Sequence, residues 1–326
     1  MKTTIRVAAA FAALFVAAAC HAQTAPGGAY PTKQVRVIVP YPPGGPTDVI
    51  ARLVAQKMTE ALGQTFFVEN LPGASGAIGA GTAANAAGDG HTLLVVTNDF
   101  AVASVTNSKL PYDPIKNFAP VSIVSASPQV VIAHPSVAAK SLKELGELAR
   151  KEPGKLTYGA MSIGFGQLTS ERFFRLGLKV DVVRVPFQGA APLITSTVGG
   201  HTSLGYIGLP PAAPLIKDGK LRALAVVGSR RSPDFPDVPT TAEAGIPGQE
   251  ADLLIGFVAT AGTPKPVVDL LQRQIARIVA LPDVKSRLTT LGFTAVASTP
   301  EAYAAQMRSD IETWGKVVKD LGIQVQ

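Results

Sequence analysis

The stretch "VIVPYPPGGPTDVIARLVAQKM", residues 37–58, runs from an apolar strand through two prolines and two glycines into an amphipathic helix. Glycine lets a bound molecule approach the backbone, because it carries no side chain above the peptide. The helix that follows points unpaired N–H groups outward from its first turn. Such N–H groups next to a glycine pair favour a negatively charged group at this turn.

The first segment has the composition of a secretory leader. Two basic residues precede an apolar run at 7–19, which is too short to span a bilayer. We therefore expect a signal peptide at 1–22, cleaved near Ala22, and a mature protein in the periplasm. The alternative is a lipoprotein in which Cys20, the single cysteine, is lipidated. An ordinary cut after "CHA" is favoured, because no bulky aliphatic residue stands three positions before the cysteine.

The composition indicates a globular protein that is large enough for two domains. Its 326 residues are 47% hydrophobic and 16% charged, which supplies ample material for buried cores. The formal net charge of +7 falls to about +5 once Lys2 and Arg6 leave with the leader. The basic residues are scattered, and the densest cluster is "SRR" at 229–231. We expect a mild surface preference for anions and no nucleic-acid binding.

Short aliphatic strands alternate with longer amphipathic segments from Gln34 onward. The pattern predicts strands at "QVRVIVP", "TFFVEN" and "HTLLVVTN", with helices between them. A turn-rich passage at 111–128 precedes a fresh series that ends with the strand "LRALAVVG". After the proline-rich segment 232–247 come the strand "LLIGFVAT" and two helices, at 264–281 and 300–320.

This alternation predicts an α/β protein of two lobes, each a mainly parallel sheet flanked by helices. One lobe comprises 30–130 plus 250–326, and the other comprises 131–249. The chain crosses between the lobes twice, so we expect a hinge made of paired segments.

Two familiar kinds of site are weak candidates. His91, His134 and His201 are far apart and lack partners at ligand spacing, which argues against a metal site. The sequence "GAGTAA" at 79–84 fits a dinucleotide-binding pattern, and Asp99 lies near the expected distance. The glycines do not follow a strand directly, so a small-residue helix packed tightly on a sheet explains them better. We expect no metal and no cofactor.

A serine hydrolase is the alternative function. The sequence "AMSIG" at 160–164 resembles a nucleophile elbow without its first glycine, and Asp181 and His201 follow Ser162 in hydrolase order. The spacing is compressed, because such enzymes place acid and base on separate later strands of a larger sheet. The plainer hypothesis is that Ser162 lends its hydroxyl and amide to a ligand. An esterase-like activity that uses Ser162 stays open at this point.

The strand-to-helix loops share glycine together with small hydroxyl or amide residues. They lie at the carboxyl ends of predicted parallel strands, where open α/β sheets bind ligands. No acid, base or nucleophile recurs among them, which favours a receptor over an enzyme. The ligand-binding residues that we predict are Tyr41, Pro43, Gly44, Gly45, Gly73, Thr97, Asn98, Ser162, Gly164, Phe187, Gly189, Ala190 and Tyr206.

In these loops the sequence resembles the periplasmic substrate-binding proteins of tripartite tricarboxylate transporters, also called Bug receptors. The matching segments include "YPTKQVRVIVPYPPGGPTDVIAR", "VENLPGASGAIGA", "VPFQGAAPLIT" and "RSPDFPDVPTTAEAG", in the family's order. The resemblance covers about residues 30–322. It implies two lobes of the Venus flytrap type that close over a small organic carboxylate, and delivery of that ligand to membrane subunits of such a transporter. We expect the receptor to be a monomer.

Several positions depart from the family's usual pattern. Gln167 stands where a histidine is expected, Ser196 and Ile207 replace acids, and Leu254 replaces a tryptophan. We expect these changes, mostly in the second lobe, to make the distal half of the pocket less polar. The resemblance also implies that backbone amides, hydroxyls and ordered water hold the carboxylate. Asp48 is then expected to cap its helix rather than touch the anion.

Overall fold

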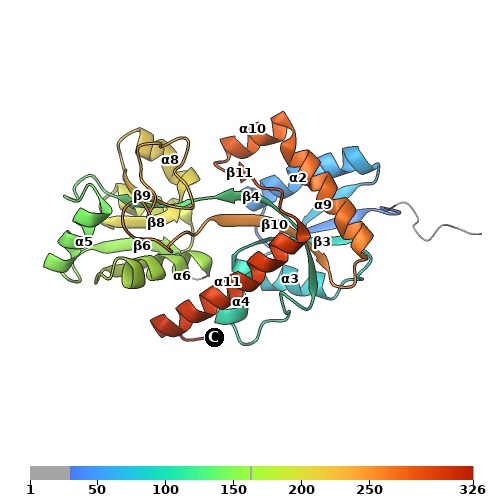
Figure 1. Cartoon of the computed structure of the whole chain (residues 1–326), viewed down its shortest axis with the longest axis horizontal. Coiled ribbons are helices and arrows are strands. Elements are labelled where there is room, and N and C mark those ends of the chain that lie inside the picture. The colour runs from blue at the N-terminus through green and yellow to red at the C-terminus, as the bar shows by residue number, and fades with distance from the viewer. Residues whose placement is uncertain (1–29, 162–163, 326) are drawn as a thin grey trace, which may run out of the picture.

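The computed structural model describes residues 30–161 and 164–325. The expected signal peptide with its cleavage site near Ala22, Cys20 and Ser162 lie outside these residues. Two separate sheets, each flanked by helices, form two lobes (Figure 1). In the described ranges, no helix combines the length and the apolar character that a membrane span requires. The predicted two-lobed α/β architecture is confirmed.

The first lobe is built on a six-stranded sheet in the order β11-β4-β10-β3-β1-β2. Its strands are β1 (Val35–Val39), β2 (Phe66–Asn70), β3 (Thr92–Thr97), β4 (Phe118–Ser127), β10 (Leu253–Thr260) and β11 (Thr294–Ala295). Its helices are α2 (Pro46–Leu62), η2 (Ala74–Gly76), α3 (Ala77–Ala84), α4 (Asp99–Thr106), α9 (Lys265–Ala280) and α10 (Pro282–Thr290). Neighbouring strand residues such as Val37 and Ile38 are both fully buried, because helices cover both faces of the sheet.

The second lobe is built on a five-stranded sheet in the order β7-β6-β8-β5-β9. Its strands are β5 (Gln129–Ala133), β6 (Thr157–Met161), β7 (Val183–Phe187), β8 (Leu204–Gly208) and β9 (Arg222–Val227). Its helices are α5 (Leu142–Lys151), α6 (Phe165–Glu171) with its π-helical continuation η3 (Arg172–Gly177), α7 (Ala190–Val198) and α8 (Leu209–Lys217). The chain enters this lobe at Pro128 and leaves it through 228–252.

Most strands of each sheet run in one direction, but both sheets are mixed. In the first lobe β10 and β11 run against the others, and in the second lobe β5 does. Strand β5 is the first strand after the chain enters the second lobe, and β10 is the first strand after it returns to the first lobe. An arriving strand starts at the edge where the other strands end, so it must run antiparallel to them. The carboxyl ends of the parallel strands of both lobes therefore face each other.

The glycine-rich sequence at 79–84 lies inside helix α3 and not in a turn before a helix. A Cβ on Gly79 would lie 2.8 Å from the Cβ of Pro40 and 2.9 Å from the carbonyl oxygen of Leu71. The small residues therefore let α3 pack tightly against the end of β1. This packing explains the motif without a dinucleotide.

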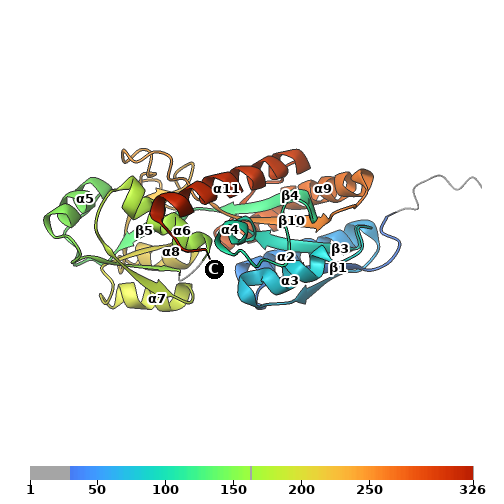
Figure 2. The ribbon, with the colours of Figure 1, turned by 90° about the horizontal axis from the view of Figure 1, so that it is seen from below.

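Helix α11 (Pro300–Leu321) packs against both lobes. Its first half places Tyr303 and Met307 in a core of the first lobe, whereas Trp314 and Val318 lie in the core of the second. Figures 1 and 2 show the helix running across the junction. The predicted boundaries assign this segment to the first lobe, and its last turns also pack in the core of the second lobe.

Both halves of α11 are held by specific contacts. Tyr303 covers Gly256 of β10, where a Cβ would lie within 2.6 Å of the tyrosine ring. The ring of Trp314 meets Phe165 edge-on, with centroids 5.4 Å apart, and the guanidinium of Arg172 lies 4.6 Å from the Trp314 ring centroid. Arg172 also donates to the carbonyl oxygen of Glu250 at 3.0 Å, in the segment that returns to the first lobe. These contacts hold the last turns of α11 against α6 and η3.

Candidate functional site

The loops that the sequence analysis singled out lie at the facing edges of the two sheets. Tyr41 follows β1 and Thr97 ends β3 in the first lobe, whereas Gly164 follows β6 and Gly189 follows β7 in the second. One hydrogen bond joins the two edges directly. The main-chain N–H of Phe165 donates to Oδ1 of Asp99 at 2.7 Å. The structure therefore brings the loops after β3 and β6 together.

The "PPGG" turn is held in place by a buried carboxylate. Asp48 is 3% exposed and accepts hydrogen bonds from the Gly44 N–H at 2.9 Å, from Nε of Arg52 at 3.0 Å and from Nδ2 of Asn70 at 2.8 Å. Burial by itself would raise the pKa of Asp48, but these hydrogen bonds outweigh it and lower the pKa below the ordinary aspartate value. Asp48 therefore stays ionised and fixes the turn. Its hydrogen bond to the N–H of Gly44, the residue before the N-cap Gly45, ties the turn to the first turn of α2.

The two glycines of this turn leave open space above it. Gly44 has φ of +87°, and no atom lies within 4 Å of the position that its Cβ would occupy. A Cβ on Gly45 would only touch the carbonyl oxygen of Pro42, at 4.0 Å. The turn thus exposes its backbone, as the sequence predicts.

The loop between β2 and α3 contains a left-handed turn. The φ angles are +133° at Gly73, +47° at Ala74, +55° at Ser75 and +96° at Gly76. Residues with a Cβ avoid this region, so Ala74 and Ser75 each store about 1 kcal/mol of backbone strain. Strain of this kind clusters at ligand sites, which supports the choice of Gly73.

Three polar side chains form a chain of hydrogen bonds at the ends of β1 and β3. The hydroxyl oxygens of Tyr41 and Thr97 lie 2.8 Å apart, and the Thr97 hydroxyl donates to Oδ2 of Asp99 at 3.3 Å. Burial, followed by the charge of Asp99, raises the pKa of Tyr41. Burial also raises the pKa of the Asp99 carboxyl. Tyr41 therefore stays protonated and acts as a hydrogen-bond donor.

The side chain of Asn98 makes its hydrogen bonds within the first lobe. Its Oδ1 accepts from the Leu254 N–H at 2.7 Å, and its side chain also hydrogen-bonds the carboxyl group of Asp310 in α11. The residue is 6% exposed. Asn98 thus fastens the start of α4 to β10 and α11.

The structure does not bring Tyr206 together with the predicted loops. Tyr206 lies in β8, is 1% exposed and packs against Phe173 of η3, with ring centroids 5.9 Å apart. Successive residues of a strand point to opposite faces, and Tyr206 points to the face that α6, η3 and the last turns of α11 cover. The remaining predicted residues, Pro43, Phe187, Gly189 and Ala190, lie at the facing edges of the sheets.

Asp99 is not among the residues predicted from the sequence to bind the ligand, and it was considered there only as a partner of the pattern at 79–84. In the structure its bond to the Phe165 N–H joins the two lobes. The signal that points to it is an acidic residue two positions after a strand whose carboxyl end faces the other lobe.

The described residues do not support a hydrolase. Met161, the residue before Ser162, ends β6, whereas Asp181 and His201 are exposed and precede β7 and β8. Both strands run parallel to β6, so the acid and the base lie at the opposite edge of the sheet. A five-residue strand spans about 16 Å, which is far beyond hydrogen-bonding distance.

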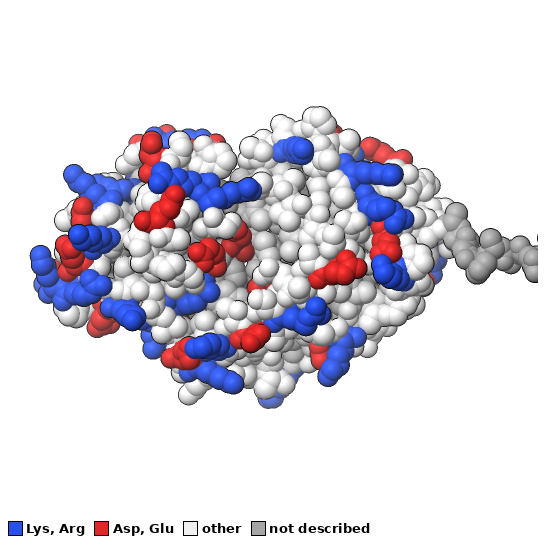
Figure 3. All heavy atoms as spheres, viewed as in Figure 1, with Lys and Arg blue, Asp and Glu red and all other residues white. Residues whose placement is uncertain are grey.

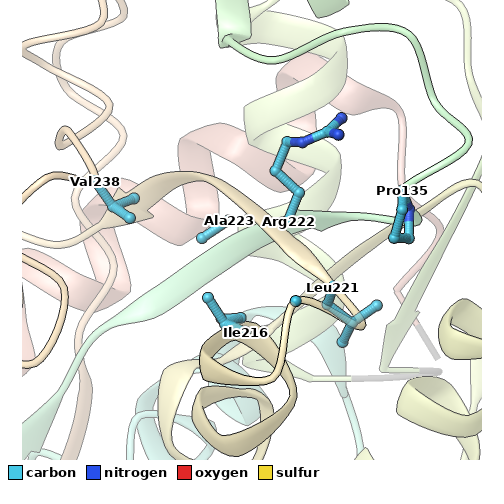
Figure 4. Close-up of a pocket in the computed structure, with 7 residues that line it drawn as sticks. Pro135, Ile216, Leu221, Arg222, Ala223 and Val238 are labelled. Carbon is cyan, nitrogen blue, oxygen red and sulfur yellow. The ribbon is translucent and has the colours of Figure 1, made fainter.

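A hollow of about 300 Å³ on the second lobe lies away from these loops. It lies between α8 and β9 and includes Ile216, Leu221 and Arg222 (Figure 4). The guanidinium of Arg222 points away from the two apolar side chains and donates to the carbonyl oxygens of Val137 and Ala139. The guanidinium of Arg222 is already hydrogen-bonded to the protein, and none of the predicted ligand-binding residues lines this hollow. The hollow is therefore not the candidate site.

The surface charge agrees with a small-molecule receptor better than with a nucleic-acid-binding protein. Lysine and arginine side chains are spread over both lobes on the face shown in Figure 3, with acidic side chains among them. A notch separates the two lobes in this view. Nucleic-acid binding needs a concentrated basic surface, which this face does not have.

The pH dependence of stability gives a test of the junction at α11. Burial raises the pKa of Asp310 to about 6, although hydrogen bonds from Gln306 and Asn98 oppose the shift. The native state therefore holds this proton more tightly than the unfolded state, and this contribution to stability falls as the pH rises from about 4 to about 6. We expect Asp310→Asn to raise the free energy of unfolding by about 1–3 kcal/mol at pH 7.5 and to change it little at pH 4.

Urea unfolding curves at the two pH values measure this effect. Glu312→Gln is the control, because Glu312 lies on the same helix and is exposed, and we expect it to change stability by less than about 0.5 kcal/mol. An equal gain from Asp310→Asn at both pH values would show that the ionised carboxylate is not the cause.

Two facing α/β lobes with glycine-rich loops at their adjoining edges define the class of a two-lobed solute-binding protein. The sequence matches a family described as "Tripartite tricarboxylate transporter family receptor" over residues 50–323. BugT of Bordetella pertussis is 31% identical over 315 residues, which cover 96% of this chain and 97% of BugT.

Solved structures give the same result. A Rhodopseudomonas palustris protein solved with adipate is 32% identical, with a TM-score of 0.78 and coverage of 90% of this chain and 99% of that chain. MatC from Rhodopseudomonas palustris, with bound malate, is 34% identical, with a TM-score of 0.74 and coverage of 89% and 100%. The chain therefore belongs to the tripartite tricarboxylate transporter receptor family, and the resemblance seen in the sequence is confirmed.

Proposed function

We propose that this chain is a periplasmic receptor that binds a small organic carboxylate between its lobes and passes it to the membrane subunits of a tripartite tricarboxylate-type transporter. The observation that carries the proposal is the meeting of the loops after β3 and β6, through the Asp99–Phe165 hydrogen bond. The relatives solved with adipate and malate support a carboxylate as the class of ligand.

The carboxylate of the ligand lies over the "PPGG" turn in this proposal. The Gly44 N–H already bonds Asp48, so the donors available to a ligand are the N–H groups of the first turn of α2, Thr47 among them. The positive end of the helix dipole adds to their attraction for an anion. The proposed ligand-binding residues are Tyr41, Pro43, Gly44, Gly45, Gly73, Thr97, Asn98, Ser162, Gly164, Phe187, Gly189 and Ala190.

The proposed lobes comprise 30–130 plus 250–326 and 131–249. The close succession of β4, Pro128 and β5 supports the first boundary, and the segment 228–252 between β9 and β10 supports the second. The receptor works as a monomer without a metal or cofactor and catalyses no reaction.

Export with removal of 1–22 completes the proposal. Intact mass measurement of the protein from the periplasm decides between a cut near Ala22 and a lipidated Cys20. A chain that begins at Gln23 supports the first, and an acylated N-terminal cysteine supports the second.

Calorimetric titration with a panel of mono- and dicarboxylates tests the function. We expect saturable 1:1 binding by at least one compound, because the site lies between one pair of lobes. A ligand at 100 times its Kd should add about 2.7 kcal/mol to the stability of the protein. Mass spectrometry of the panel after incubation should show no product. The proposal fails if no carboxylate binds, or if the protein hydrolyses methyl esters of these carboxylates that are incubated with it in parallel.

A further inference from the structure

One carboxamide joins the two ends of the "PPGG" turn. Asn70 is the last residue of β2 and pairs with Val39 of β1. Its Nδ2 donates to the carbonyl oxygen of Tyr41 at 3.1 Å, directly before the turn, and to Oδ1 of Asp48 at 2.8 Å, directly after it. Residues 42–47, which include both glycines, lie between these two points. Asn70 therefore fixes the start of the turn relative to its end.

A third partner orients this carboxamide. Oδ1 of Asn70 accepts a hydrogen bond from Nη2 of Arg52 at 2.8 Å. Arg52 lies one turn after Asp48 in α2, and its Nε donates to Oδ2 of the same aspartate at 3.0 Å. A carboxamide offers two N–H donors and one carbonyl acceptor, so Asn70 matches two acceptors and one donor with no group left over. An ionised carboxylate of the same size has no donor and cannot make this set.

Asn70 ties the turn to the sheet at its polar end. The apolar face of α2 is already held, because Ile50 and Val54 are buried in the core of the first lobe. The hydrogen bond from the Gly44 N–H to Asp48 stays within the unit formed by the turn and the helix. Asn70 belongs to β2, so its hydrogen bonds set where the first turn of α2 lies relative to the end of β1. Donors that are held in place before binding lose less freedom when a ligand arrives.

We propose that Asn70 is a positioning residue of the ligand site, which holds the "PPGG" turn and the first turn of α2 in the shape that binds a carboxylate. The proposal rests on the proposed function, because that function assigns the ligand's carboxylate to these N–H groups. Asn70 acts through Tyr41 and Asp48 and does not itself touch the ligand. It therefore sets the affinity for carboxylates from behind the turn.

Asn70→Asp tests the proposal by calorimetric titration with the panel of mono- and dicarboxylates, adipate and malate among them. The change keeps the size of the side chain and the acceptor for Arg52, but it turns a carboxylate oxygen toward Asp48 and the Tyr41 carbonyl. We expect the Kd at pH 7.5 to rise at least about tenfold, because hydrogen bonds to a charged group are lost and a repulsion is gained.

The pH profile of this variant separates positioning from a general loss of structure. Two carboxyls that face each other share a proton, and the shared proton restores one donor. Relative to the wild-type protein at the same pH, we therefore expect Asn70→Asp to regain at least about threefold in affinity between pH 7.5 and pH 5. Asn70→Ala removes the donors at every pH, so its loss should be the same at both values.

Asn85→Asp is the matched control. Nδ2 of Asn85 also donates to a backbone carbonyl, that of Gly81 at 2.8 Å, but it does so at the end of α3 that is remote from Gly73. We expect this variant to keep wild-type affinity at both pH values. Melting curves at each pH show whether the variants are folded.

An affinity within about threefold of the wild-type value in folded Asn70→Asp at pH 7.5 overturns the proposal. A loss that does not shrink at pH 5 also overturns it, and both results leave the receptor function intact. If Asn70→Asp does not fold at pH 7.5, Asn70→Ala decides: a tenfold higher Kd supports the proposal, and an unchanged Kd overturns it. If no carboxylate of the panel binds the wild-type protein, the proposed function fails, and the assignment of Asn70 fails with it.

Discussion

Gly44→Val is expected to abolish ligand binding, with the Kd for a carboxylate identified by titration raised at least 100-fold, while the protein remains folded. A valine side chain at this position extends into the open space above the "PPGG" turn, where no atom lies within 4 Å of the Cβ position. That is the space in which the proposal places the ligand's carboxylate. A 100-fold loss corresponds to about 2.7 kcal/mol of binding free energy.

The same substitution also strains the backbone, because Gly44 has φ of +87° and a β-branched residue avoids this region. We expect a loss of about 1–2 kcal/mol of stability from this cause. Gly219→Val is the control that separates the effect of backbone strain from the effect of blocking the ligand site. Gly219 has φ of +70° and an equally open Cβ position, but it lies at the hollow on the second lobe. We expect Gly219→Val to lose similar stability and to keep its affinity.

Arg230→Ala provides the second control. Arg230 is exposed on the segment that returns to the first lobe, and we expect its removal to change the Kd by less than about threefold. Titration calorimetry and a melting curve for each variant give both quantities. Native affinity in folded Gly44→Val, or loss of binding in Arg230→Ala, would show that the site has been placed wrongly.

Trp314→Ala is expected to lower the free energy of unfolding by about 3–5 kcal/mol, the usual cost of truncating a buried tryptophan. Trp314 is 3% exposed and packs on Phe165 and under the guanidinium of Arg172. Its removal leaves a cavity between α11 and the second lobe and also leaves Arg172 without its aromatic partner.

Urea unfolding followed by circular dichroism measures this loss. Trp314→Phe should cost less than half as much, because phenylalanine fills part of the space and keeps an aromatic face under Arg172. Ile78→Ala is the surface control, because Ile78 is 55% exposed, and it should cost less than about 0.5 kcal/mol. A loss below about 1 kcal/mol for Trp314→Ala would mean that the last turns of α11 do not contribute to the stability of the second lobe.

Much of the fold could be predicted from local sequence signals. Helix α2 starts at the proline that follows the glycine pair and ends at Gly63, which adopts the left-handed conformation typical of a helix end. Strands β1 and β3 are apolar runs of the expected length. Helix α8 was missed, because three prolines, including Pro214 inside the helix, hide it. Strand β8 was missed with it, because its five residues include two glycines.

The part of the candidate site that is formed by exposed backbone could be predicted from the sequence. The contacts between side chains and loops of different lobes could not. The glycines of the "PPGG" turn were found from the sequence, because glycine itself marks exposed backbone. The link between Asp99 and Phe165 joins residues 66 positions apart, and no local pattern reveals it. Tyr206 lies in the core beneath α6 and η3, and the strand pattern alone does not show which helices pack on which face of β8.

Helix α11 makes the junction a three-point attachment. Two chain crossings alone would let the lobes rotate about a single hinge axis. Helix α11 is about 33 Å long and has side chains buried in the cores of both lobes. A large rotation of one lobe would therefore have to bend this helix or remove Trp314 from the second core. Opening of the two lobes is therefore coupled to the packing of the last turns of α11 in the second core.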